Sequence, residues 1–187
     1  MKRTTAFIFA ILLLACINGR ADGQFGVKAM YVDFRTEVRT LSSIKELASE
    51  AAGLGFNTML MEYEATFPFD NNATLQNRYS FTKDEIREFV SYCSGLGLDV
   101  IPLQNCMGHA QYILKHDRYA ALREDAKDMS QVCPLKIKEA IPVFTDIFKE
   151  VAALHPSKYF HIGCDETFLL GSCPECAAYA EKYGKSK

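Results

Sequence analysis

The sequence predicts an α/β fold built on a parallel sheet. Short apolar runs rich in strand formers alternate with longer segments whose apolar residues recur at helical spacing. Two of the helical segments stop at the same Gly-Leu-Gly turn, at residues 53–55 and 95–97. Strands that alternate with single helices are joined by right-handed crossovers and pair in parallel, either in an open doubly wound sheet or in a (β/α) barrel.

The first βα unit lies near the amino-terminal end. Residues 27–32 are an apolar run that predicts the first strand, and residues 43–46 (Ser-Ile-Lys-Glu) have the form of a capping box that opens a helix. The glycines of residues 53–55 end that helix. Residues 56–61 are therefore expected to form the second strand.

The same pattern repeats after a long loop. Residues 82–85 (Thr-Lys-Asp-Glu) form a second capping box, residues 95–97 end the helix, and residues 98–103 predict the third strand. A third helix is expected between residues 134 and 154, where Pro142 should kink it or mark a later start. The fourth strand is then predicted at residues 159–163.

Polar side chains follow each predicted strand, and they decide between the two kinds of sheet. The residues in question are Asp33, Arg35 and Glu37; Glu62 and Glu64; Gln104, Asn105 and His109; Asp165 and Glu166. In a barrel these strand ends form one rim around a common pocket. No glycine-rich phosphate loop follows the first strand, which removes the main support for a nucleotide-binding open sheet. We therefore expect the first four βα units of a (β/α)8 TIM barrel.

The first two dozen residues have the pattern of a secretory signal. A basic start at Lys2 and Arg3 precedes an apolar run over residues 6–15, which is too short to span a membrane comfortably. Residues 13–16 (Leu-Leu-Ala-Cys) favour a bacterial lipoprotein signal with Cys16 lipidated, although residues 19–21 would also suit ordinary cleavage. We expect residues 1–21 to be the signal. In a bacterium, the protein would then be exported either to the periplasm or to a membrane surface, where it is anchored as a lipoprotein.

Composition excludes some partners and cofactors. The 187-residue chain carries a formal net charge of −2 and has no cluster of basic residues with interleaved aromatics, so no nucleic acid is expected as a partner. Residues 173–176 (Cys-Pro-Glu-Cys) could form half of a zinc site or a redox pair. Because no second Cys/His pair at ligand spacing accompanies them, the sequence predicts no metal site and no cofactor.

Residues 160–166 are the most informative stretch. An apolar approach (Phe-His-Ile-Gly) leads through Cys164 to the adjacent carboxylates Asp165 and Glu166. A buried strand that ends in acidic residues is how α/β enzymes present catalytic groups. The alternative is that Asp165 only caps a following helix.

This stretch resembles the signature of glycoside hydrolase family 20, the β-N-acetylhexosaminidases, and in particular their hexosaminidase-D-like branch. The family signature is His-Ile-Gly-(Gly/Cys)-Asp-Glu, which residues 161–166 match. Supporting similarities occur at residues 62–68, 100–109 and 114–116. The combination is far more specific than any single piece.

The resemblance implies a retaining glycosidase that removes terminal GlcNAc or GalNAc from glycans. Glu166 would be the general acid/base, and Asp165 would position the 2-acetamido group that acts as nucleophile. This family is a known exception to the scheme of two catalytic carboxylates. Neighbouring residues of a strand point in opposite directions, so an Asp-Glu pair on a strand would be poorly placed to act as acid and nucleophile on one bond.

The resemblance also implies further contacts with the sugar. His109 would line the pocket and Arg35 would bind sugar hydroxyls, although many relatives space this basic residue differently. Glu64 would supply the acidic group after the second strand, a role for which Glu62 is equally available. His161 is expected to be a buried partner of the site and not a direct catalyst.

The length of the chain departs from the family. A full barrel needs about 250 residues, so residues 22–187 are expected to be a truncated catalytic domain with half of the pocket, ending in a helix at 177–183. An alternative is a catalytically inactive carbohydrate-binding remnant on the cell surface, and a second is an unrelated redox or metal protein. The sequence leaves open the choice between GlcNAc and GalNAc, the natural glycan and the oligomeric state.

Overall fold

A computed structural model of the protein describes residues 25–184. The predicted signal of residues 1–21, with Cys16 as its lipidated residue, lies outside the described residues. Among the described helices, none has both the length and the hydropathy that crossing a bilayer requires.

A three-stranded parallel sheet forms the centre of the molecule. Its strands are β1 (Ala29–Asp33), β2 (Thr58–Glu62) and β3 (Asp99–Leu103), in the order β1-β2-β3. The three predicted strands are confirmed, with the first two shifted by one or two residues toward the carboxyl end. Since all three strands run in parallel, the loops that follow them meet at one edge of the sheet.

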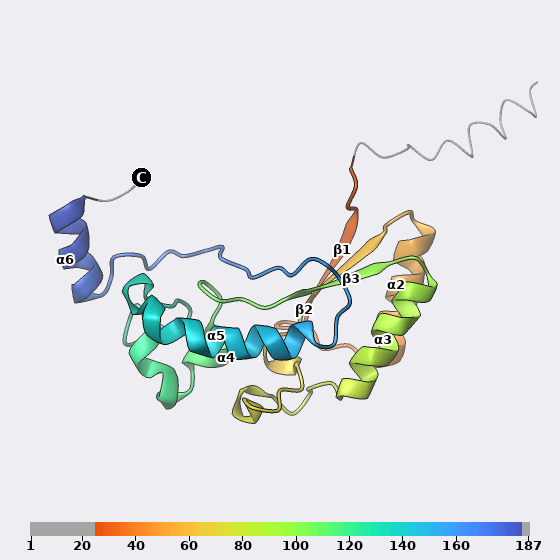
Figure 1. Ribbon diagram of the computed structural model, residues 1–187, viewed down its shortest axis with the longest axis horizontal. Helices are drawn as coiled ribbons and strands as arrows, with labels where there is room; N and C mark the ends of the chain where they lie inside the picture. Colours follow the sequence, from red (N-terminus) through yellow and green to blue (C-terminus); the bar gives the residue numbers. More distant parts are fainter. Residues whose placement is uncertain (1–24, 185–187) are drawn as a thin grey trace, which may run out of the picture.

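Two helices cover one face of this sheet (Figure 1). They are α2 (Leu41–Gly53) and α3 (Lys83–Gly95), and they pack over the fully buried side chains of Met59 and Met61. The capping box predicted for α3 is present, because Thr82 and Glu85 exchange hydrogen bonds at its first turn. The box predicted for α2 is wrong: this helix begins earlier, with the Thr40 side chain accepting the hydrogen bond from the Ser43 amide.

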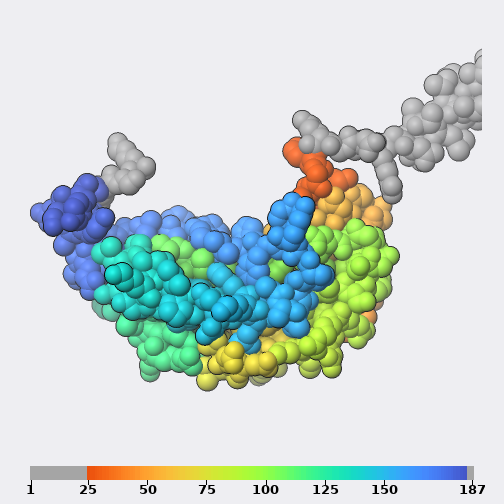
Figure 2. All heavy atoms as spheres, in the orientation of Figure 1, coloured from red at the N-terminus to blue at the C-terminus, as the bar shows by residue number. Residues whose placement is uncertain are grey.

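The remaining segments follow the sheet toward the carboxyl terminus. Helix α5 (Ile137–Ala152) continues a short 3₁₀ turn, η4 (Pro134–Lys136), and contains Pro142, so the later start considered for this helix is wrong. Helix α6 (Pro174–Tyr183) lies at the far end of the molecule in Figures 1 and 2. Shorter elements are η1 (Glu64–Thr66), η2 (Ala73–Leu75), α4 (Gln111–Leu114) and η3 (Asp117–Leu122).

The predicted fourth strand is present only as an isolated parallel bridge between His161 and Leu103. The His161 amide donates to the Pro102 carbonyl, and the His161 carbonyl accepts from the Gln104 amide, so the segment does run beside β3. Extended geometry ends two residues later, at Gly163, whose φ of +49° is left-handed. The described residues therefore form three βα units and a bridged segment, so the predicted fourth βα unit is not confirmed.

The inner face of the sheet, opposite α2 and α3, is open. Tyr31 on β1 is 48% exposed, and it lies beside Leu60 on β2, which is partly exposed. Residues 159–172 then run along the molecule toward α6 (Figure 1). This open face and the carboxyl ends of the strands position the candidate site.

Candidate active site

Charged side chains from β1 and β2 form one network at the carboxyl edge of the sheet. The Arg35 guanidinium pairs with the carboxylates of Asp33 and Glu62, at 2.9 Å in each case. The Tyr31 hydroxyl also donates to Glu62. Asn105, which follows β3, donates to the same carboxylate, so three successive strand ends are joined through Glu62.

Glu64 lies beside this network and is buried. Its amide donates to the Gln104 side-chain oxygen at 3.0 Å, and its carboxylate accepts from the Asn105 side chain at 2.9 Å. Burial raises the pKa of Glu64 to about 8, and the neighbouring Glu62 carboxylate adds to the shift, while Asn105 and Arg35 oppose it. Near neutral pH this carboxyl group therefore tends to keep its proton.

His109 connects the third strand to the acidic pair. Its Nε2 atom lies 3.0 Å from the Glu166 carboxylate and 3.6 Å from that of Asp165. Glu166 has a left-handed backbone with φ of +50°, so the pair is not on a strand. The expectation that the two side chains point in opposite directions is therefore wrong, since both carboxylates reach the same imidazole nitrogen.

Two glycines allow this segment to approach the loop after β3. A Cβ atom at Gly108 would lie 2.0 Å from the Asp165 carbonyl oxygen, and one at Gly163 would lie 1.8 Å from the Asn105 side-chain oxygen. Gly163 also has a positive φ. Only glycine fits either position, because any side chain would displace the acidic segment or the Asn105 amide.

Backbone strain is concentrated in the same residues. Within residues 25–184, Glu64, His109 and Glu166 are the residues other than glycine with positive φ, at +45°, +52° and +50°. Such conformations cost of order 1–3 kcal/mol each and cluster at functional sites. All three are among the site residues that the sequence and the family resemblance predict.

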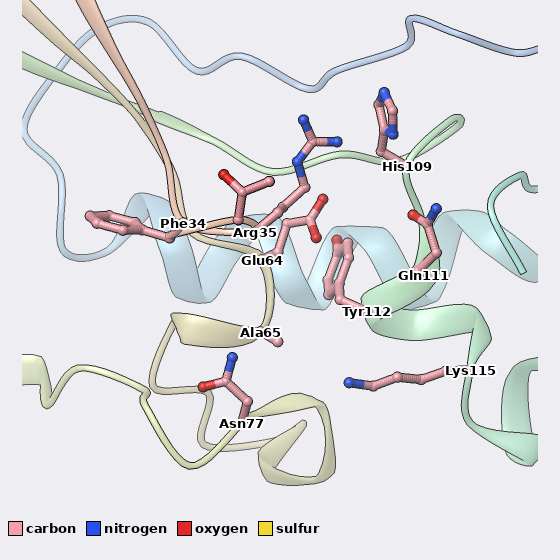
Figure 3. Close-up of a pocket in the computed structure, with 10 residues that line it drawn as sticks. Phe34, Arg35, Glu64, Ala65, Asn77, His109, Gln111, Tyr112 and Lys115 are labelled. Carbon is pink, nitrogen blue, oxygen red and sulfur yellow. The ribbon is translucent and has the colours of Figure 1, made fainter. Parts of the chain in front are cut away.

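Two pockets adjoin the network, and Arg35 and His109 line both. The first, of about 490 Å³, is also lined by Glu64 and Tyr112. In Figure 3, His109 lies at one end of this pocket and Asn77 and Lys115 lie toward the other. The second, of about 340 Å³, is lined by Asp165 together with residues of the open sheet face: Tyr31, Leu60, Glu62, Leu103, Asn105 and His161.

The structure thus brings the predicted site residues together. Asp165, His109 and Arg35 share the second pocket, and Glu64 shares the first with His109 and Arg35. Glu166 lines neither of these two pockets and joins the site through His109. Asp165 does not act as a helix cap, because the next helix begins only at Pro174.

Some site residues were missed or misplaced by sequence reasoning. Tyr31 received no role, although its place two residues before Asp33 puts it on the same face of β1. Tyr112 was also missed; its hydroxyl donates to the Asn105 carbonyl at 2.8 Å. His161 was expected to be buried, but it is exposed, because it lies on the open face of the sheet.

Within the described part of the chain, the only group of residues close enough to share a metal ion lies elsewhere. It consists of Glu124, Cys133, Cys173 and Cys176, and none of these residues lines either pocket. The two pockets of the candidate active site are lined by carboxylate, imidazole, guanidinium, hydroxyl and amide groups and by the Cys164 thiol.

Relatives of known function are similar to most of the chain. It is 29% identical to Hexosaminidase D of Bos taurus over 163 residues, which cover 86% of this chain and 47% of that protein. It is 32% identical to Hexosaminidase D of Homo sapiens over 151 residues, covering 79% of this chain and 30% of that protein. The chain thus spans less than half the length of these relatives.

Solved structures show the same fold at lower sequence identity. A β-N-acetylhexosaminidase of Bacteroides fragilis superposes with a TM-score of 0.69 at 20% identity, covering 86% of this chain and 36% of that one. A family 20 exo-β-N-acetylglucosaminidase of Vibrio harveyi, solved with N-acetylglucosamine, gives a TM-score of 0.64 at 20% identity, covering 88% of this chain and 31% of that one.

The family model described as "Glycosyl hydrolase family 20, catalytic domain" matches residues 33–187, which include the strand ends, His109 and the acidic pair. The α/β fold with its parallel sheet agrees with that match. The chain belongs to glycosyl hydrolase family 20.

Proposed function

We propose that these residues act within a family 20 catalytic domain that removes terminal N-acetylhexosamine residues from glycans, with retention of configuration and with assistance from the substrate. Membership of the family supports the reaction class. The basic and apolar start of the sequence supports export, which would give the enzyme access to glycans outside the cytoplasm.

In the first step, Glu166 donates its proton to the glycosidic oxygen as the bond to the anomeric carbon breaks. The acetamide oxygen of the same sugar attacks that carbon from the opposite face and closes a cationic oxazolinium ring. Asp165 accepts a hydrogen bond from the acetamide nitrogen, which orients the nucleophile and stabilises the positive charge. One protein acid suffices because the substrate brings its own nucleophile.

In the second step, Glu166 acts as a base. It removes a proton from a water molecule, whose oxygen attacks the anomeric carbon from the face that the leaving group vacated. The oxazolinium ring opens, the acetamide is restored, and two inversions give net retention. Glu166 ends the cycle protonated, as it began.

The contact of His109 with both carboxylates carries this proposal. An imidazole 3.0 Å from Glu166 and 3.6 Å from Asp165 can hold the two carboxylates close together at the edge of the pocket that His109, Asp165 and Arg35 line. The left-handed backbone at His109 and Glu166 indicates that this arrangement is maintained at a cost. Arg35, Tyr31 and Glu62 offer polar partners for sugar hydroxyls nearby.

The acid role of Glu166 is tested by Glu166→Gln in the protein expressed from its gene. We expect turnover of aryl N-acetyl-glucosaminides and N-acetyl-galactosaminides to fall about 10²- to 10⁴-fold. The loss should be larger for a poor leaving group than for a nitrophenol, which departs without full protonation. Glu139→Gln, a change at an exposed carboxylate on α5, is the matched control.

The role of Asp165 is tested in the same assay. Asp165→Asn should slow N-acetyl substrates and weaken binding of a neutral thiazoline that mimics the cyclised acetamide, whereas Glu166→Gln should leave thiazoline binding largely intact. If both variants turn over substrate at the rate of the Glu139→Gln control, the proposed mechanism is wrong.

A further inference from the structure

Four potential metal ligands converge at the end of the molecule that carries α6. Cys173 and Cys176 lie at the start of this helix, Cys133 precedes η4, and Glu124 follows η3. One ligand atom from each of these residues lies within 4.8 Å of all the others. The spacing of residues in the sequence indicates only the pair at 173–176, because the other two residues are more than 35 positions away in the chain.

The distances between the sulfur atoms match a tetrahedral zinc site. Cys133 Sγ lies 3.5 Å from Cys176 Sγ and 3.8 Å from Cys173 Sγ. Zinc–sulfur bonds of about 2.3 Å in a tetrahedron place two sulfurs about 3.8 Å apart. A disulfide needs about 2.05 Å and would use only two of the three thiols. All three cysteines are unbridged in the structure.

Glu124 provides the fourth ligand in an orientation that its neighbours fix. One carboxylate oxygen accepts hydrogen bonds from the amides of Gly171, at 2.9 Å, and Cys173, at 3.2 Å. The other oxygen lies 3.3 Å from Cys176 Sγ, inside the cluster. Hydrogen bonds that hold a ligating carboxylate in this way are typical of the surroundings of metal sites.

Glu124 is buried and hydrogen-bonded, but it has no cationic partner among the described residues. The residue is only 1% exposed, and among the described residues no lysine, arginine or histidine forms an ion pair with it. A buried carboxylate without a cationic partner is costly, and buried charges in proteins are normally paired or coordinate a metal. A divalent cation bound by Glu124 and the thiolates would remove this cost.

Among the described residues, few contacts other than the cysteine cluster attach helix α6 to the rest of the molecule. Cys176 is its only buried residue, and its ion pair between Glu175 and Lys136 is solvent-exposed, so water screens this contact and it holds the helix only weakly. The Cys176 amide donates to Cys173 Sγ at 3.2 Å, so the first turn is organised around the sulfur atoms. A bound metal would join α6 to the segments that carry Glu124 and Cys133.

We propose that Glu124, Cys133, Cys173 and Cys176 bind one Zn²⁺ ion in a tetrahedral structural site that holds α6 in place. Three thiolates with one carboxylate suit zinc among the common divalent ions. Four protein ligands leave no open position for substrate or water, so the site is structural and separate from the candidate active site. A surface pocket lined by Arg123, Glu124 and Cys173 gives the ion a route of entry.

The test is metal analysis of the full chain, purified under reducing conditions without a metal-affinity tag. We expect inductively coupled plasma mass spectrometry to detect about one zinc ion per chain. Replacement with Co²⁺ should give the visible and near-ultraviolet bands of tetrahedral cobalt thiolate. A chelator should release the ion and make α6 sensitive to limited proteolysis, and added Zn²⁺ should restore its protection.

Substitutions locate the site, and the chain offers a matched control. Cys176→Ser and Cys133→Ser should abolish stoichiometric zinc, and Glu124→Gln, which keeps nearly the same shape, should weaken Zn²⁺ binding at least tenfold. Cys106→Ser and Cys164→Ser should retain full zinc, because their thiols lie 3.7 Å apart with no further ligand from the described residues. If Cys176→Ser does not fold, the Glu124→Gln and Co²⁺ measurements still decide the question.

Two results would overturn the proposal. One is a well-folded, reduced protein that takes up neither Zn²⁺ nor Co²⁺. The other is a disulfide between two of Cys133, Cys173 and Cys176 that persists as the main form of the folded protein purified under reducing conditions. Equal loss of zinc from the Cys106→Ser control would also contradict the assignment to these four residues.

Discussion

Two residues of the candidate site combine a left-handed backbone with close contact to carboxylates. His109 adopts a left-handed backbone and touches both acidic side chains, while Glu64 adopts one and stays buried beside Glu62. Two carboxylates at close range cannot both ionise without cost. Arg35 and Asn105 offset this repulsion in part, and the proton retained by Glu64 offsets the rest.

The protonation of Glu64 predicts a pH dependence of stability. Its pKa is raised from 4.5 to about 8 in the folded protein, so between these pH values the folded state binds more protons than the unfolded state. The free energy of unfolding should therefore fall as the pH rises from about 4.5 to about 8. Glu64→Gln removes the titrating group, and the stability of the variant relative to the wild-type protein should increase over this range.

Urea denaturation at pH 5, 6, 7 and 8 measures this effect as a difference between the two proteins. Burial lowers the pKa of His155, which titrates in both proteins, so its contribution cancels. Glu46→Gln, on the exposed side of α2, should show no such trend. A difference between Glu64→Gln and wild type that is independent of pH would show that Glu64 is ionised in the folded protein.

The path of the chain after β3 determines how closely the loop at Gly108 approaches the segment that carries Asp165 and Glu166. The segment after β3 turns at Gly108 against the carbonyl of Asp165, and the segment bridged to β3 turns at Gly163 against Asn105. These close contacts, one with a backbone carbonyl and one with the Asn105 side chain, place the acidic pair near the ends of β1 and β2. The segment around His161 reaches this position without forming a full strand. Backbone hydrogen bonds of His161 with Pro102 and Gln104 align it with β3.

The close approach at Gly108 predicts a large effect of a single methyl group. Gly108→Ala should force the Asp165 carbonyl to move and should lower the turnover of N-acetylhexosaminides more than it lowers the melting temperature. Gly53→Ala is the control: its Cβ would meet nothing within 4 Å, and the helical position should tolerate alanine or gain stability of about 0.4–1 kcal/mol. Equal turnover in the two variants would show that the position of Asp165 does not depend on Gly108.

At the scale of the whole molecule, the candidate site lies on an open surface. The side chains of Asp165 and Glu166 are 65% and 55% exposed, and the inner face of the sheet is uncovered at Tyr31. Strand β1 also has a free edge among the described residues. Exposed apolar faces and unpaired strand edges favour self-association.

This openness predicts that residues 25–187, expressed on their own, will not hydrolyse N-acetylhexosaminides measurably. Positioning of the substrate can supply about 7–11 kcal/mol of a barrier, and a pocket open on one side forgoes much of it. The assay compares both epimeric substrates with a Glu166→Gln version of the same fragment, and light scattering reports its oligomeric state. Activity above that control from a folded monomer would show that this open site is sufficient.

Local patterns in the amino-acid sequence are enough to predict the family, the three strands and the position of the acidic pair. These features depend on local patterns, such as the alternation of apolar runs, the capping box of α3 and the contiguous signature at residues 161–166. The order of strands follows from the same patterns, since helices between successive strands enforce parallel pairing. Site residues at strand ends could be predicted for that reason.

Contacts between residues that are distant in the chain become visible only in the folded protein. The contact of His109 with both carboxylates, the approach of Gly108 to Asp165, and the meeting of Cys133 and Glu124 with Cys176, 43 and 52 positions away, depend on the paths of long loops. Loop paths result from many weak contacts and leave no periodic pattern in the sequence. The burial of Glu64, which raises its pKa, and the exposure of His161 depend on those paths in the same way.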